Sequence, residues 1–179
     1  MKKIEPYVYP KHLERHVTLK DGTKVFLRPI KPEDRDLWVD FYISLSKLSK
    51  YYRFFSARPV PTEDMIKKYT QIDYVNNLAL VAIIKENGKD RMIGVVRYIL
   101  DKDGAAELAV VVADDWQGKG LGTKMLLAIL DVIIRRKIKK IKGDIFLENQ
   151  KMLQILLESG FKFISEDEYG VKHFEIELD

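Results

Sequence analysis

Residues 105–126, AAELAVVVADDWQGKGLGTKML, decide the fold of this chain. An apolar run is followed by a short polar turn, by three glycines within five residues, and by apolar residues at helical spacing. This order predicts a buried strand, a glycine-rich loop and an amphipathic helix. Backbone N–H groups lack partners where a helix begins, and the helix dipole favours negative charge there. The stretch therefore predicts a phosphate site.

The three glycines and one acid give this loop its chemical character. Gly118, Gly120 and Gly122 place no Cβ in the path of a ligand. The loop is not a Walker loop, because no Gly-Lys-Ser/Thr ends it, and Thr123 stands where a dinucleotide fingerprint needs its last glycine. Glu107 lies just upstream in the apolar strand, where we expect it to be buried and to act as a stronger base than a solvated acid. A phosphate site beside a buried acid indicates group transfer from a phosphorylated carrier.

Length and composition limit the alternatives. The 179 residues predict an N-terminal arm (1–14) and a single domain (15–179). A net charge of +4 is small for a dedicated nucleic-acid binder, and the lack of cysteine excludes disulfides, cysteine-based zinc sites and a cysteine nucleophile. The chain has neither an apolar N-terminal run nor a segment long enough to span a bilayer. We expect a cytoplasmic protein with no membrane partner and no metal.

Turn signals and periodicity predict the remaining elements. Asp21-Gly22 between alternating runs predicts a hairpin, Thr62 is suited to cap a helix, and Gly160 is suited to end one. Residues 46–61 are expected to be irregular. We expect strands over 16–20, 24–28, 78–84, 92–100, 105–112, 138–146, 161–164 and 172–178, and helices over 32–45, from 62, over 120–137 and over 149–159. This order predicts a mixed α/β fold, with a mostly antiparallel central sheet flanked by helices.

This order of elements and the loop of residues 117–122 resemble the GNAT superfamily of N-acetyltransferases. Its signature is Gln/Arg-x-x-Gly-x-Gly/Ala after the fourth core strand, and Gln117, Gly120 and Gly122 fill those positions. The resemblance extends from Val25 to the C-terminus. Within the superfamily, the chain looks most like the Pat-type protein lysine acetyltransferases of bacteria and archaea, on the segments 27–34, 52–55, 70–74 and 106–107.

The resemblance implies acetyl-CoA as co-substrate. It implies that the pyrophosphate lies on the loop and that the pantetheine arm pairs with the strand before it, as a peptide pairs with a sheet edge. It also implies that an asparagine after the next strand contacts the cofactor. The implied cofactor-binding residues are Val110, Val111, Val112, Gln117, Gly118, Lys119, Gly120, Leu121, Gly122, Thr123, Asn149 and Met152. One departure is Leu156, which stands where many members carry a tyrosine that protonates the departing thiolate.

Glu107 is the expected catalytic residue. A lysine amine has a pKa near 10.4, so only about one molecule in a few thousand is neutral at pH 7, and a base therefore matters. Glu107 would accept the proton directly or through a water. The attack is expected to be direct, in a ternary complex, with a backbone N–H near residues 110–112 stabilising the oxyanion. Asp73 and Glu148 are alternative bases.

Several features also have purely structural interpretations. Glu107 can be an acid paired with Arg97 or one that simply lies at the sheet surface. Arg53 is expected to form a structural salt bridge rather than to contact the substrate. The basic run 135–142 suits a helix end and a solvated strand edge, or attracts the phosphate of CoA or an acidic partner. The neighbouring aromatics either cover the core or line a channel for the acceptor lysine: Tyr51, Tyr52, Phe54 and Phe55.

The leading prediction is an N-acetyltransferase that acts on a protein lysine ε-amine. The resemblance suggests acyl-CoA synthetases or basic chromatin proteins as partners, without direct contact with nucleic acid. A small-molecule amine acetyltransferase and a non-catalytic acyl-CoA sensor are the alternatives. Oligomeric state, acyl-chain preference and the identity of the general acid stay open.

Overall fold

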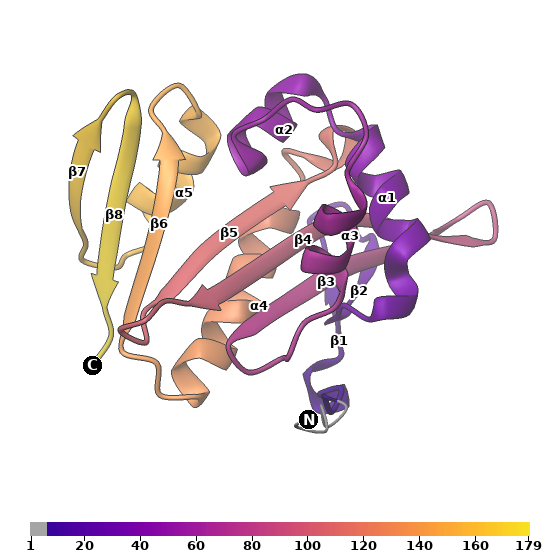
Figure 1. The fold of residues 1–179 in the computed structure, drawn as a ribbon, viewed down its shortest axis with the longest axis horizontal. Helices are drawn as coiled ribbons and strands as arrows, with labels where there is room; N and C mark the ends of the chain where they lie inside the picture. Colours follow the sequence, from indigo (N-terminus) through magenta and orange to yellow (C-terminus); the bar gives the residue numbers. More distant parts are fainter. Residues whose placement is uncertain (1–6) are drawn as a thin grey trace.

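The computed structural model describes residues 7–179, and within this range one eight-stranded sheet forms the centre (Figure 1). The first part of the expected N-terminal arm, residues 1–6, lies outside the described residues. The strands are β1 (Arg15–Thr18), β2 (Lys24–Pro29), β3 (Asn77–Glu86), β4 (Lys89–Leu100), β5 (Ala106–Val112), β6 (Lys140–Phe146), β7 (Ile164–Glu168) and β8 (Val171–Glu177). The helices are α1 (Arg35–Ser44), α2 (Lys47–Phe54), α3 (Glu63–Thr70), α4 (Leu121–Arg135) and α5 (Gln150–Glu158).

The sheet is mixed, as the sequence predicted. Its order is β1-β2-β3-β4-β5-β6-β8-β7, and within residues 7–179 each neighbouring pair is antiparallel except β5–β6. The parallel pair requires a crossover, which α4 supplies.

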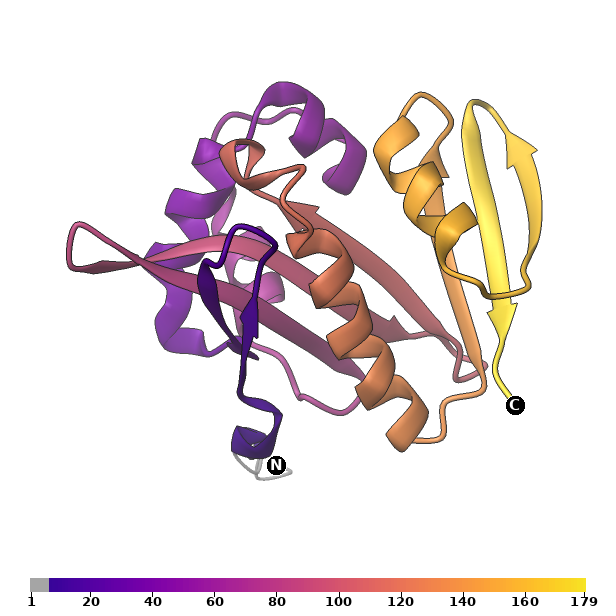
Figure 2. The same ribbon diagram turned by 180° about the vertical axis from the view of Figure 1, so that it is seen from behind.

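Helices cover both faces of the sheet. Helices α1, α2 and α3 lie on one face, while α4 and α5 lie on the other (Figures 1 and 2). Gly94 of β4 lets α4 approach closely, because a Cβ there would lie 2.8 Å from the Sδ atom of Met125. On the opposite face, the ring of Trp38 from α1 stacks on Tyr69 of α3, with centroids 5.4 Å apart. The core therefore has two apolar layers with the sheet between them.

The parallel pair β5–β6 is the most unusual part of the sheet. Only Ala106 with Ile141 and Glu107 with Lys142 are paired. Beyond these two pairs the strands diverge, and Figure 1 shows β6 leaving β5 toward the top of the view. From Leu108 onward, one edge of β5 has no partner strand among residues 7–179, while its other edge pairs with β4.

Local chemistry accounts for most helix boundaries. The side chain of Thr62 accepts a hydrogen bond from the Met65 N–H and begins α3 as predicted. Gly160, with φ of 79°, follows α5. The expectation that residues 46–61 are irregular is wrong for residues 47–54, where the side chain of Ser46 caps α2 through the Ser49 N–H. It is confirmed for residues 55–61, which form neither helix nor strand.

The C-terminal strands also differ from expectation. The strand predicted over residues 161–164 is instead β7, which begins at Ile164. Phe161 and Phe163 pack against the core from a loop instead. Every side chain of β7 is exposed, so this strand depends on its pairing with β8 and carries no apolar pattern.

The chain before β1 packs against the domain. Residues Lys11–Leu13 form a 3-10 turn, and Leu13 is buried in the core. The ring of Tyr9 contacts Tyr74 edge-on, with centroids 5.9 Å apart. Within residues 7–179, no helix has both the length and the apolar character needed to cross a bilayer.

Candidate active site

The glycine-rich loop joins β5 to α4 in a conformation that exposes its amides. Gly118 and Gly120 have φ of 77° and 86°, in the left-handed region that favours glycine. Gly120 precedes α4, and no side chain caps this helix. Within residues 7–179, nothing accepts from six successive backbone N–H groups: those of Gly118, Lys119, Gly120, Leu121, Gly122 and Thr123. Such a run of free donors at a helix N-terminus is suited to bind a diphosphate.

Space and charge around the loop also suit an anion. A Cβ built on Gly118 would meet nothing within 4 Å, so the approach to this amide is open. The Nζ of Lys119 lies 4.9 Å from the centroid of the Trp116 ring, and the aliphatic end of Lys20 lies near Gly120. These lysines add positive charge beside the free amides.

Gln117 connects the loop to three other elements. Its Nε2 donates to the Val112 carbonyl at 3.0 Å and to the Ser49 Oγ of α2 at 3.3 Å. Its Oε1 accepts from the Nζ of Lys151 on α5 at 3.4 Å. This last bond brings the start of α5 to the loop, across the gap between β5 and β6.

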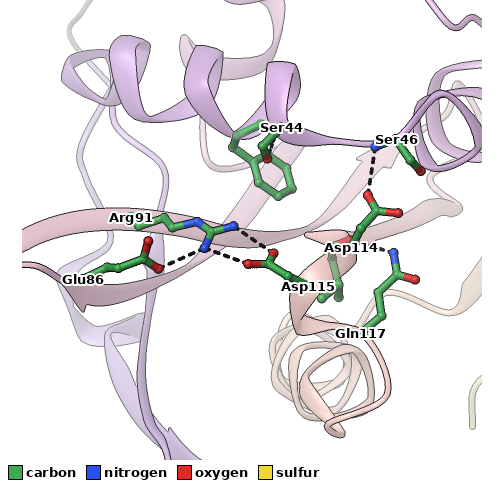
Figure 3. A network of polar contacts seen from close by, with 9 residues as sticks. Ser44, Ser46, Glu86, Arg91, Asp114, Asp115 and Gln117 are labelled. Atoms are coloured by element: carbon green, nitrogen blue, oxygen red, sulfur yellow. Dashed lines mark hydrogen bonds and ion pairs between the residues drawn. The ribbon is translucent and has the colours of Figure 1, made fainter.

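The turn before the loop is joined to the start of α2 by hydrogen bonds and to β4 by an ion pair (Figure 3). The carboxylate of Asp114 accepts from the Ser46 N–H at 2.9 Å and from the Ser49 Oγ at 3.0 Å. The next residue, Asp115, pairs instead with Arg91 of β4, which also contacts Glu86. The loop is thus braced on one side by α2 and on the other by the sheet.

Val110, Val111 and Val112 lie on the stretch of β5 that has left β6. They pair with β4 through Val96, Val95 and Gly94. Their other backbone edge faces the gap between the diverging strands (Figure 1). The structure therefore brings the predicted pantetheine strand and the predicted pyrophosphate loop into one continuous segment.

Glu107 lies at the point where β5 and β6 part, as the last paired residue of β5. Its side chain is exposed, so the expected burial is wrong. The reason is that β6 diverges immediately afterwards and leaves this position uncovered. The suggested pairing with Arg97 is not found, since Arg97 donates to the Asn77 side chain and the Tyr69 carbonyl instead.

The two alternative bases are placed less well. The carboxylate of Asp73 accepts from the N–H groups of Val75, Asn76 and Asn77 and thereby holds a turn. Burial alone would raise the pKa of Asp73, but these hydrogen bonds outweigh it and the pKa is lowered. Glu148 is exposed in the loop that precedes α5.

The predicted contacts on α5 have structural roles as well. Asn149 caps the helix, and its Oδ1 accepts from the Met152 N–H at 3.3 Å. The side-chain amide of Asn149 donates to nothing within residues 7–179, so it stays available to a ligand. Leu156 is 7% exposed and belongs to the core, so this position supplies no acid.

Aromatic side chains of α2 close the far end of the gap. Tyr51, Tyr52 and Phe55 all contact Phe146 at the end of β6, with centroid distances of 4.7, 5.7 and 4.9 Å. Phe54 turns the other way and packs on Trp38, Tyr42 and Tyr69. The first three rings therefore bridge the diverging halves of the sheet, whereas Phe54 is a core residue.

Two arginines meet on the face of the sheet that α1, α2 and α3 cover. Arg97 is 2% exposed, and burial together with the nearby Arg53 charge lowers its pKa to about 9. The expected salt bridge of Arg53 is wrong: its guanidinium lies 4.9 Å from the Phe54 ring centroid and 5.6 Å from that of Tyr69, with no carboxylate of residues 7–179 paired to it. Such cation–π contacts contribute about 0.5–2 kcal/mol each. A desolvated charge costs several kcal/mol, so these contacts offset the cost only in part.

Comparisons with known proteins identify the family. The family model for the acetyltransferase (GNAT) domain matches residues 24–162. The chain is 30% identical over 145 residues to acetyltransferase PA5475 of Pseudomonas aeruginosa, covering 80% of this chain and 78% of that protein. It is 26% identical over 164 residues to acetyltransferase Pat of Mycolicibacterium smegmatis, covering 90% of this chain and 48% of Pat, so it spans about half of that relative.

A solved structure gives the same result at the level of the fold. The GNAT domain of S. lividans PAT superposes with a TM-score of 0.85 and 32% identity, over 96% of this chain and 100% of that domain. The chain belongs to the GNAT acetyltransferase family. It is thus an acetyl-CoA-dependent acyltransferase, and the resemblance read from the loop and the order of elements is confirmed.

Proposed function

We propose that this acetyltransferase moves the acetyl group of acetyl-CoA to the ε-amine of a protein lysine. The observation that carries the proposal is the continuous segment from the free edge of β5 to the six free amides of the loop. The pyrophosphate lies on residues 118–123, and the pantetheine arm pairs with Val110–Val112. Both are elongated contacts that fit the shape of coenzyme A.

Glu107 is the general base in this proposal. It lies at the end of the gap opposite the glycine loop, where the acyl end of a CoA threaded along β5 arrives. The lysine attacks the thioester carbon directly, its proton passes to Glu107 or to a bridging water, and CoA leaves as the thiolate. A free backbone N–H of β5 stabilises the oxyanion.

The exposure of Glu107 favours a protein as acceptor. A lysine on a protein surface can reach an exposed carboxylate without the rest of its chain entering the enzyme. The similarity to Pat-type domains supports the same acceptor class.

Acetyl transfer from labelled acetyl-CoA tests the proposal. The enzyme is incubated with a cell extract, and label is measured in proteins and in small molecules separately. We expect label in protein bands. Label confined to small amines would favour a small-molecule acetyltransferase, and binding of acetyl-CoA without transfer to any acceptor would favour a sensor.

A further inference from the structure

Arg53 and Arg97 both lie beside the Tyr69 ring, and neither has an acidic partner among residues 7–179. The guanidinium of Arg97 lies 5.1 Å from the Tyr69 ring centroid, and that of Arg53 lies 5.6 Å from it. Neither forms an ion pair with a carboxylate among residues 7–179, although other arginines of this chain, such as Arg28 and Arg91, each bind one. Arg97 is removed from water while Arg53 is partly exposed, so an anion that reaches Arg53 is stabilised by both charges.

Arg97 is fixed in place. Its Nη1 donates to the Asn77 Oδ1 at 2.9 Å and its Nη2 to the Tyr69 carbonyl at 2.7 Å, while its buried Nε has no partner. The residue is 2% exposed, so it cannot turn outward. It therefore acts as a permanent positive charge behind Tyr69.

Arg53 is the accessible member of the pair. It lies near the C-terminal end of α2 and is partly exposed. Its guanidinium lies against the rings of Phe54 and Tyr69, which hold the planar group in place. No carboxylate among residues 7–179 pairs with its hydrogen-bonding edge. A planar fork of this kind is suited to bind a carboxylate in bidentate fashion.

The register of the sheet places Arg97 on the face that carries Glu107, and α2, which carries Arg53, lies on this face too. Arg97 is paired with Ala79 of β3 and Ala109 of β5. Glu107 lies two residues before Ala109 on the same strand, so its side chain points to the same face. An anion held by Arg53 and an amine held by Glu107 therefore belong on one side of the sheet, and one acceptor molecule can carry both.

We propose that the acceptor carries a carboxylate that pairs with Arg53 while its amine lies at Glu107. This inference rests on the proposed function, and it specifies the acceptor as a lysine with an aspartate or glutamate close to it in the acceptor protein. The α-carboxylate of a free amino acid has the same chemistry, and the experiment separates the two sources.

Short peptides with a single lysine test the proposal on the wild-type enzyme. Glu or Gln is placed at each neighbouring position in turn, and kcat/KM is measured at saturating acetyl-CoA. We expect at least one position at which Glu raises kcat/KM about 10- to 100-fold over Gln, as a charge-assisted pair does. Equal rates for Glu and Gln at every position would overturn the proposal without a variant being made.

Variants of α2 then locate the effect. In Arg53→Gln, the ratio of kcat/KM for the Glu peptide to that for the Gln peptide should fall to about one. In Arg53→Lys, this ratio should stay above one but below the wild-type value. Lys47→Gln removes the same charge from an exposed site at the start of α2 and should leave the ratio unchanged. If the Arg53→Gln variant still binds acetyl-CoA and still prefers the Glu peptide over the Gln peptide to the same degree, the proposal is contradicted.

Free lysine and lysine amide separate this inference from the proposed function. If no peptide is acetylated but free lysine is acetylated much faster than lysine amide, the proposal of a protein acceptor is wrong, while the pairing of a carboxylate with Arg53 is supported. If no peptide is acetylated and the two small acceptors react equally, both are wrong.

Discussion

Glu107 illustrates how much one residue depends on the strand beside it. It is the last residue of β5 that pairs with β6, and the divergence of β6 leaves it open to solvent. An acid at this position meets an incoming amine without a conformational change in the sheet. In the proposed mechanism, Glu107 therefore acts as a base from an exposed position and not from a buried one.

Replacing this carboxylate with an amide tests its role. Glu107→Gln should keep acetyl-CoA affinity and lower kcat near pH 7 by about 10²- to 10⁴-fold, because no base then accepts the proton of the lysine. The loss should shrink as pH rises, since the neutral fraction of a lysine grows about tenfold per unit. Glu177→Gln, at an exposed position in β8, is the control. Unchanged turnover of a protein substrate would exclude Glu107 as the base.

The glycine loop offers a matched pair of substitutions. Gly118 and Gly104 have φ of 77° and 80°, and a Cβ on either would meet nothing within 4 Å. Alanine at either position should therefore lower the free energy of unfolding by about 1–2 kcal/mol. Only Gly118→Ala should also weaken acetyl-CoA binding in calorimetry, because its Cβ enters the ligand's approach. Equal affinity in the two variants would indicate that the phosphates lie elsewhere.

At the scale of the element, α2 is held more by the loop than by its own packing. Lys50 is its only buried residue, and Asp114 anchors its first turn through Ser46 and Ser49. The helix carries the rings that meet Phe146 and the guanidinium of Arg53. Helix α2 therefore connects the glycine loop to the side of the site that the proposed acceptor approaches.

Removing the anchor should loosen this helix selectively. Asp114→Ala should lower stability by about 1 kcal/mol, speed hydrogen exchange of residues 47–54 and raise the acceptor KM. Asp115→Ala breaks the ion pair with Arg91 and should leave exchange in α2 unaltered. Similar exchange in both variants would mean that α2 is held by its other contacts.

A second element-scale prediction concerns pH and the β6–β8 pair. Asp144 lies 2.5 Å from the Nδ1 of His173, and this hydrogen bond raises the pKa of His173 above 6.5. The pair stabilises the fold fully below pH 6.5, and this contribution is lost as pH rises through the raised pKa. Asp144→Asn should return the His173 pKa toward 6.5 in an NMR titration. This substitution should lower the free energy of unfolding only at pH values where His173 is protonated. The loss should stay below about 1 kcal/mol, since both side chains are about half exposed.

The sequence predicted those elements that are marked by a pattern in their own residues. Strand β5, the glycine loop and α4 follow from a local pattern, and the structure has all three. Helix α2 escaped prediction although two local signals were present: the Ser46 cap and the helical spacing of Leu48, Tyr51, Tyr52 and Phe55. Most of these side chains are exposed, so the stripe does not mark a core-facing helix. The exposure of Glu107 and the meeting of Arg53 with Arg97 depend on neighbours far away in the chain, and no local pattern records them.

At the scale of the whole molecule, the site is a gap within one sheet that two helices, α5 and α2, bridge. Lys151 reaches Gln117 at one point, and α2 reaches Phe146 at another. Acetyl-CoA would add a third connection, from the edge of β5 to the amide of Asn149. Binding should therefore raise the free energy of unfolding, by about 2.7 kcal/mol at a hundredfold excess over Kd. Thermal unfolding with and without the ligand measures this, and no shift at saturating acetyl-CoA would contradict it.

The narrow join between β5 and β6 has a consequence for cooperativity. Strands β5 and β6 are connected by only two residue pairs, whereas β4–β5 and β6–β8 are each connected by seven. Residues 140–177 should then behave as a separate foldon, which opens in the free enzyme at a lower free energy than residues 77–112. Native-state hydrogen exchange at low denaturant should show residues 140–177 exchanging first as a block, and saturation with coenzyme should merge the two transitions into one.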